Sequence, residues 1–191
     1  MAKFCQLTLI LHISVVGLAF ADDSWKYELL DKENGNRARH QAAPLNYNEE
    51  LAQKAQRWAD QLAAECGKMH HEDTSSSPNA QYNGEGLGEN IHFAGMVGGS
   101  PTNMQQFGER MAPGAADDWY DEEKYYPWPE FTGQELPHMV FHFTQEVWQG
   151  TREVGYGLGA RDGCPSIYVV GRYYPGGNVL PMFGQNVLPP Q

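Results

Sequence analysis

The chain has 191 residues and a mass of 21.4 kDa, which suits one domain or two small ones. Its composition, 41% hydrophobic and 12% aromatic, permits a sizeable core and excludes a wholly disordered chain. The formal net charge is −11 at pH 7, so the chain lacks the basic surface of a general nucleic-acid-binding protein. Basic residues do not cluster anywhere, which also argues against a polybasic membrane-binding patch.

The N-terminus has the three-part layout of a secretory signal peptide. Lys3 supplies a positive charge, residues 7–20 are almost wholly apolar, and Ala19-Phe20-Ala21 has the small-x-small pattern that signal peptidase cleaves. The apolar run falls short of the ~20 residues that a membrane span needs. We therefore expect residues 1–21 to be removed, leaving a secreted, extracellular single domain over residues 22–191 with no membrane span.

Removal of the signal peptide leaves two cysteines, Cys66 and Cys164. In an oxidising compartment an even pair of cysteines is more often bridged than free, so we expect a disulfide between them. In the chain-entropy model, closing a loop of this length stabilises the fold by roughly 4–5 kcal/mol.

The clearest predicted element is a helix that follows Asn46. Asn46 and Glu49, three residues apart, form a helix-start signal, and Gly67 is a plausible stop. One face of this segment carries an apolar stripe, formed by Leu51, Ala55, Trp58, Ala59, Leu62 and Cys66. A weaker helix is expected at residues 25–34, before this one.

Two long loops and two further helices are expected in the middle of the chain. Residues 72–88 are polar and residues 95–113 are rich in glycine, so both segments are predicted to be loops. A helix is expected at residues 115–125, with Trp119 and Glu122 on one face, and another from Pro137 to about Gly150.

The end of the chain changes to the period-two pattern of strands. Residues 154–158 alternate apolar side chains with glycines, Asp162-Gly163 offers a turn, and residues 167–174 return as a strand. Helices first and a hairpin last predict an α+β domain with helices packed on an antiparallel sheet.

Common catalytic motifs are absent from the sequence. His138 and His142 have the i, i+4 spacing of a zinc-protease helix, but Met139 stands where that motif needs its glutamate base. The serine-hydrolase elbow and the P-loop are missing, and the glycine-rich residues 84–90 follow a polar loop rather than a strand. The other candidate fragments, around His70, Glu89, Glu122 and His142, are each compatible with an ordinary structural role when taken singly.

Together, however, four short motifs in order resemble the CAP superfamily, which includes cysteine-rich secretory proteins, insect venom antigens and plant pathogenesis-related class 1 proteins. They are Gly88-Glu-Asn-Ile91, Trp119-Tyr-Asp-Glu122, His142-Phe-Thr-Gln-Glu-Val-Trp148 and Tyr168-Val-Val-Gly-Arg-Tyr-Tyr-Pro-Gly-Gly-Asn178-Val. The ending Gln185 to Pro190 is similar to that of the Golgi-associated plant pathogenesis-related group, whose members lack a signal peptide. The resemblance covers nearly all of the mature chain.

The resemblance implies a three-layer α-β-α sandwich with a central, mainly antiparallel sheet and an open cleft. It also implies a cleft tetrad of two histidines and two glutamates, which here corresponds to His70, Glu89, Glu122 and His142. His71 is the alternative to His70, which we favour because it lies four residues after Cys66, as in cysteine-bearing relatives. Such a set suits one divalent cation, zinc above all.

The resemblance favours a binding protein, in defence, reproduction or host interaction, over an enzyme. Its ligand would be a lipid, a sterol or an extracellular protein. The alternative is a metal-dependent hydrolase that uses the same tetrad. Gly95 occupies the position of a serine that has been proposed as a nucleophile in the Golgi-associated group, which weakens a serine-protease interpretation. The chain also lacks the cysteine-rich tail of the cysteine-rich secretory proteins.

Overall fold

The computed structural model describes residues 23–96, 101–129, 131 and 139–191, so the predicted signal peptide lies outside the described residues. Its main sheet has the strand order β1-β5-β6-β4. These strands are β1 (Asn46–Tyr47), β4 (Gly88–Gly95), β5 (Glu153–Ala160) and β6 (Ser166–Tyr174). The pairs β4–β6 and β5–β6 are antiparallel, and only the short β1 runs parallel to β5. The predicted C-terminal hairpin is therefore confirmed.

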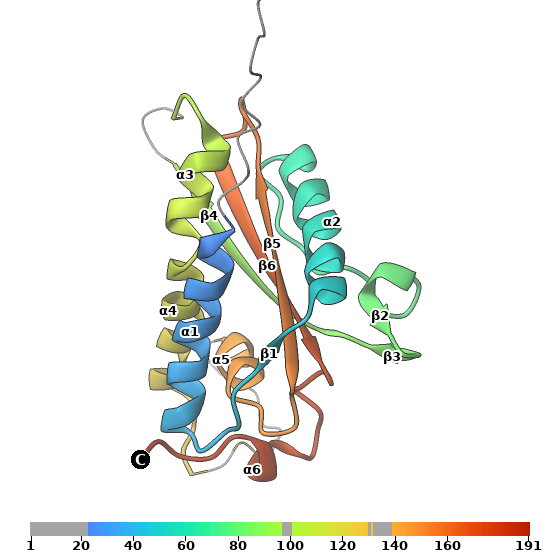
Figure 1. The fold of residues 1–191 in the computed structure, drawn as a ribbon. Coiled ribbons are helices and arrows are strands. Elements are labelled where there is room, and N and C mark those ends of the chain that lie inside the picture. The colour runs from blue at the N-terminus through green and yellow to red at the C-terminus, as the bar shows by residue number, and fades with distance from the viewer. Residues whose placement is uncertain (1–22, 97–100, 130, 132–138) are drawn as a thin grey trace, which may run out of the picture.

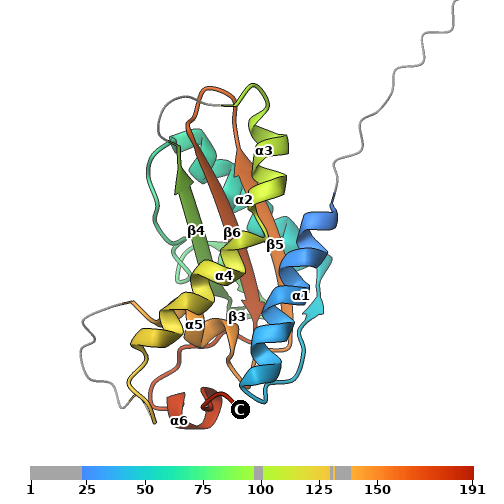
Figure 2. The same ribbon diagram turned by 90° about the vertical axis from the view of Figure 1, so that its left-hand side faces the viewer.

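Helices cover both faces of this sheet, which confirms the expected α-β-α sandwich (Figures 1 and 2). One face is covered by α2 (Glu49–Glu65) and the other by α1 (Ser24–Arg39), α3 (Met104–Met111) and α4 (Gly114–Tyr120). The smaller elements are η1 (Pro78–Ala80), β2 (Gln81–Tyr82), β3 (Glu85–Gly86), η2 (Asp121–Tyr125), α5 (Phe141–Glu146) and α6 (Phe183–Asn186). No helix among the described residues has the length and apolar composition to cross a bilayer.

The predicted apolar helix is α2, and its apolar stripe faces the sheet. Asn48, rather than Asn46, caps its N-terminus, because the Asn48 side chain accepts hydrogen bonds from the Glu50 and Leu51 amides. The helix ends where Cys66 and Gly67 both adopt positive φ angles. The Gly67 amide then donates to the Tyr168 hydroxyl at 2.7 Å, which ties the helix end to β6.

Glycines in β5 allow α2 to lie unusually close to the sheet. A Cβ atom on Gly157 would lie 2.3 Å from the Gln56 backbone nitrogen, and one on Gly155 would lie 2.1 Å from that of Ala52. At this short separation the Gln56 side chain reaches the strand backbone, donating to the Leu158 carbonyl at 2.7 Å and accepting from its amide at 3.0 Å. The alternation of glycines in β5 is therefore a packing requirement.

The first helix, α1, extends beyond the predicted residues 25–34. The sequence pattern did not reveal the extension, because the buried face of this helix is partly charged. Arg37 is fully buried, and its guanidinium donates to the backbone carbonyls of Ala43, Glu146, Trp148 and Thr151. Burial lowers the pKa of Arg37 to about 10, which still leaves it charged at neutral pH. A helix that buries charged side chains in this way lacks the apolar periodicity that a sequence pattern would reveal.

Three predicted segments differ from the structure. Residues 72–88, predicted to be a loop, contain η1 and the short antiparallel pair β2–β3. The glycine-rich residues 95–113, predicted to be a loop, contain α3, which Asn103 caps by accepting from the Gln106 amide. The helix predicted from Pro137 to Gly150 is represented by the shorter α5, and Pro137 lies outside the described residues. The expected helix at residues 115–125 is α4, continued by the 3-10 turn η2.

The expected disulfide is present between Cys66 and Cys164. It links the end of α2 to the turn between β5 and β6, across a sequence separation of 98 residues. The bond therefore links α2 covalently to the turn of the hairpin against which this helix packs.

We expect Gly157→Ala to destabilise the protein by at least about 2 kcal/mol, because the new methyl group would overlap the α2 backbone rather than a side chain that can move. In thermal unfolding this corresponds to a drop in Tm of about 4–8 °C. Gly35→Ala is the matched control, since nothing lies within 4 Å of the added Cβ in α1. That change is expected to raise stability slightly, and an equal loss in both variants would refute the close-approach explanation.

For the disulfide, we expect purified native protein to contain no titratable thiol at Cys66 or Cys164 and reduction to lower its Tm by several degrees. Thiol titration before and after denaturation, followed by calorimetry with and without reductant, measures both. Two reactive thiols in the freshly purified native protein would contradict the bridge.

Candidate functional site

The candidate site lies along β4, the strand at the edge of the main sheet (Figure 2). Side chains alternate along a strand, so Glu89 and Ile91 face α2 whereas Asn90 and His92 face the other helical layer. Ile91 accordingly belongs to the core cluster formed with α2. Asn90 instead donates to the His142 carbonyl of α5 at 3.0 Å. Residues from both layers can therefore meet only around the open edge of β4.

The first pair at this edge joins His71 and Glu89. His71 Nδ1 lies 2.6 Å from Glu89 Oε1, and this contact raises the pKa of the His71 imidazole. The other Glu89 oxygen lies 3.0 Å from Nη1 of Arg172, a fully buried cation that also contacts Glu72. Glu89 is thus fixed by Arg172, while 61% of the His71 side chain is exposed.

The favoured His70 lies elsewhere, and the alternative, His71, occupies the position beside Glu89. His70 Nε2 contacts Glu65 Oε2 at 2.9 Å, and its ring packs edge-on against Trp58. The positive φ angles of Cys66 and Gly67 turn the chain sharply at this point. Because of this turn, the spacing of four residues from Cys66 to His70 does not predict which of the two histidines lies beside Glu89.

The second pair joins Glu122 and His142 on the opposite face of β4. Glu122 Oε1 lies 2.7 Å from His142 Nδ1. Its Oε2 accepts from the His142 and Phe143 backbone amides at 3.0 and 3.3 Å. Since Val140 offers no side-chain cap to α5, the carboxylate of Glu122 fulfils that role from a separate segment. The same carboxylate therefore fixes both the start of α5 and the orientation of the His142 ring.

A third pair, His92 and Asp118, was not predicted from the sequence. His92 Nδ1 lies 3.2 Å from Asp118 Oδ2, which joins β4 to α4. Burial lowers the pKa of His92, so its imidazole is uncharged at neutral pH. The sequence held one signal for this pair: His92 lies two residues after Asn90, which places both on the same face if the segment is a strand. That signal could be used only once residues 88–95 were recognised as a strand.

The second and third pairs line a pocket of about 240 Å³ at the edge of β4. Its described lining residues are Met69, Ile91, His92, Phe93, Asp118, Trp119, Glu122 and His142. Because Ile91 and His92 face opposite layers, the pocket extends around the strand edge rather than lying on one face of the sheet. The predicted residues Glu122 and His142 are thus brought together in a pocket, whereas Glu89 and His71 are not among its lining residues.

In each pair, Nδ1 of the histidine faces the carboxylate. A carboxylate accepts a hydrogen bond from Nδ1–H, which keeps the proton on Nδ1 and leaves the lone pair of Nε2 for a metal or a ligand proton. The donor chemistry of His71 and His142 therefore fits a transition-metal cation, with the glutamates as orienting groups. Within the described residues, no three His, Cys, Asp or Glu side chains are grouped closely enough to hold a metal ion, so cation binding would require the pairs to approach each other.

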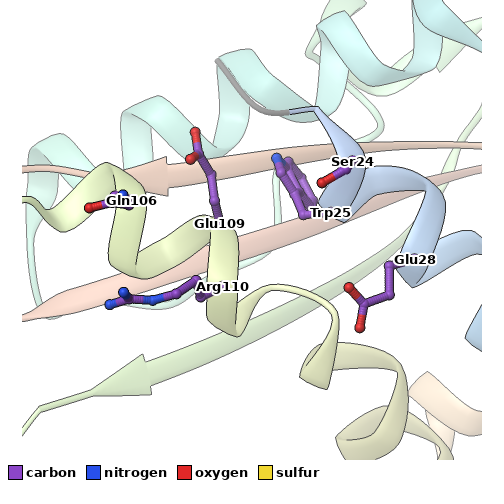
Figure 3. A pocket seen from close by; sticks show the side chains of 6 residues that line it. All are labelled: Ser24, Trp25, Glu28, Gln106, Glu109 and Arg110. Carbon is purple, nitrogen blue, oxygen red and sulfur yellow. The ribbon is translucent and has the colours of Figure 1, made fainter. Parts of the chain in front are cut away.

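A larger pocket, of about 340 Å³, lies between the beginning of α1 and α3 (Figure 3). It is lined by Ser24, Trp25, Glu28, Gln106, Glu109 and Arg110. None of these residues was predicted to be functional, and no histidine or cysteine is among them. The chemistry of the β4 edge, rather than pocket size, therefore identifies the candidate site.

Comparison with known proteins agrees with this arrangement. The family model "CAP: Cysteine-rich secretory protein family" matches residues 30–173, which include the first three motifs and the first half of the fourth. The chain belongs to the CAP family. The human Golgi-associated plant pathogenesis-related protein 1 is 32% identical to this CAP protein over 176 residues, covering 90% of the chain and 97% of the relative. Pathogenesis-related protein 1C of Nicotiana tabacum is 30% identical, covering 93% and 90%.

Solved structures support the same fold. The crystal structure of NaASP2 with Zn²⁺ has a TM-score of 0.64 at 23% identity, covering 90% of this chain and 88% of that one. Venom allergen-like protein 4 of Schistosoma mansoni has a TM-score of 0.59 at 19% identity, covering 82% and 91%. At these identities the likeness establishes the three-layer architecture of the CAP domain and nothing about ligands.

We expect Glu89→Gln to lower the pKa of the His71 imidazole, because the carboxylate that stabilises the protonated ring is replaced by a neutral amide. The pKa of His70 should stay unchanged, since Glu65 is the group that raises it. Titration of the histidine ring resonances by NMR measures both values, and Glu65→Gln, with the reverse pattern, is the matched control. A shift of His70 in the Glu89 variant would contradict the assignment of the pairs.

Proposed function

We propose that this CAP protein is secreted and acts as an extracellular binding protein through the cleft at the open edge of β4. The observation that carries this proposal is the convergence of three His–carboxylate pairs on one strand edge, two of them held by glutamates that are 5% and 16% exposed. The N-terminal signal-peptide pattern supports secretion. A lipid, a sterol or an extracellular protein is the proposed ligand class, and a role in defence, reproduction or host interaction would follow from such binding.

We further propose that His71, Glu89, Glu122 and His142 bind one divalent cation, with zinc as the favoured ion. Nε2 of each histidine would be a ligand, and each glutamate would hold its histidine in the required tautomer. The exposed His71 side chain is the group free to move toward His142. The proposal is also consistent with a structural relative having been crystallised with Zn²⁺.

The charges around the tetrad are compatible with a dication. Arg172 balances part of the negative charge of Glu72 and Glu89, while no Lys or Arg of the described residues forms an ion pair with Glu122. Neutral imidazoles and carboxylates are the ligand types that zinc accepts in proteins. The cation would therefore add positive charge to an edge that remains acidic overall.

We expect the metal-free protein to bind one zinc ion, and His142→Ala and His71→Ala each to weaken the affinity by about tenfold or more. Binding should also weaken as the pH falls through the histidine range, because a protonated imidazole cannot ligate a metal. Titration calorimetry at neutral and mildly acidic pH measures both effects.

His70→Ala is the matched control for this titration, because it removes an adjacent imidazole that contacts Glu65 rather than Glu89. Its zinc affinity should equal that of the unaltered protein. Equal affinity and stoichiometry in the His142→Ala variant would instead show that zinc binds other surface histidines and would reject the tetrad.

A further inference from the structure

The pocket beside His92 and Asp118 combines negative charge with apolar walls. We propose that it binds a small organic ammonium ion that carries an apolar group, of the size of an arylalkylamine. This inference deepens the proposed function, on which it rests, by naming a ligand class for the same cleft. The residues that carry it are Asp118, Phe93 and Met69, none of which belongs to the tetrad.

The charge of the pocket favours a cation. Asp118 and Glu122 both line it, and no Lys or Arg is among the described lining residues. Glu122 already accepts hydrogen bonds from the His142 ring and from backbone amides. The Asp118 side chain is 68% exposed, and among the described residues its ion-pair partner is the His92 imidazole alone. Asp118 is therefore the carboxylate accessible to an incoming ammonium group.

The walls of the pocket favour an apolar group on the same ligand. The accessible apolar surface comes from Phe93 and Met69, which are 39% and 55% exposed, because Ile91 and Trp119 are buried. A cation that approaches the Phe93 ring gains from its quadrupole in addition to the carboxylate. Covering the exposed apolar side chains would add a hydrophobic contribution. An ammonium group attached to an apolar body meets both requirements.

The size and spacing of the pocket suit a small organic cation without any rearrangement of the side chains. Its volume of about 240 Å³ lies below the roughly 300–1,000 Å³ of sites for drug-sized ligands. The lining histidines and carboxylates do not form a group of three that could hold a metal ion. An ammonium group needs no such convergence, because each N–H can donate to a separate acceptor.

The test is calorimetric titration of the mature, metal-free protein with 2-phenylethylamine and with 2-phenylethanol, its neutral counterpart. We expect saturable binding of the amine with one ligand per chain, and at least about fivefold weaker binding of the alcohol. Asp118→Asn should weaken amine binding by a similar factor while leaving alcohol binding unchanged.

Asp117→Asn is the matched control, because Asp117 is the neighbouring acidic residue of α4 but pairs with Lys32 of α1 instead of lining the pocket. It should bind the amine as the unaltered protein does. Equal weakening in both variants, equal affinity for amine and alcohol, or no saturable amine binding would each overturn the inference.

The His71→Ala variant separates this inference from the tetrad proposal. If it loses zinc affinity and retains amine binding, both proposals are supported. If the amine binds but zinc affinity does not depend on His71 and His142, the tetrad proposal alone is rejected. Zinc binding that depends on His71 and His142, together with no amine binding, would reject the pocket alone.

Discussion

The geometry of the site depends on one constraint, the alternation of side chains along an edge strand. Because β4 has no neighbour on its outer side in the described sheet, groups from the α2 layer and from the α4 layer can both reach around it. Glu89 projects toward one layer and His92 toward the other. A central strand would separate the two layers completely, so this cleft is possible only at the edge.

The groups that support the site are more deeply buried than the groups that would meet a ligand. Arg172 has no exposed surface and holds Glu89, and Arg37 has none and joins α1 to the end of α5. Glu122 stabilises the start of α5 and orients His142 with a single carboxylate. Removing a buried partner of this kind leaves an unpaired charge, which costs far more than losing an exposed contact. The framework of the site is therefore fixed, whereas His71 and Asp118 remain accessible to solvent.

Much of the fold could be predicted from the sequence, since α2 and the C-terminal hairpin carry strong periodic patterns. The disulfide followed from the cysteine count. By contrast, α1 buries Arg37 and Glu33, so its apolar periodicity is weak. The hydrogen-bond partners that stabilise these two buried charged groups come from distant segments, which a local pattern does not reveal. The helix α3 was hidden by the glycines of the surrounding segment, and its own Gly108 packs closely against the Leu158 side chain.

The site was less predictable than the fold. Glu89, Glu122 and His142 followed from motif resemblance, and the structure places Glu122 beside His142 and His71 beside Glu89. The choice between His70 and His71 depended on a turn with positive φ angles at Cys66 and Gly67, which residue spacing does not reveal. The His92–Asp118 pair requires both the register of β4 and the position of α4. Such tertiary placement lies beyond any local pattern.

The central claim is that the pairs on the two faces of β4 act as one site. The most direct test follows the ring resonances of His71 and His142 by NMR while zinc is added to the metal-free mature protein. We predict that both sets of resonances change together and that the change is complete at one equivalent of zinc. A change at only one of the two histidines, or completion at separate equivalents, would contradict a shared site.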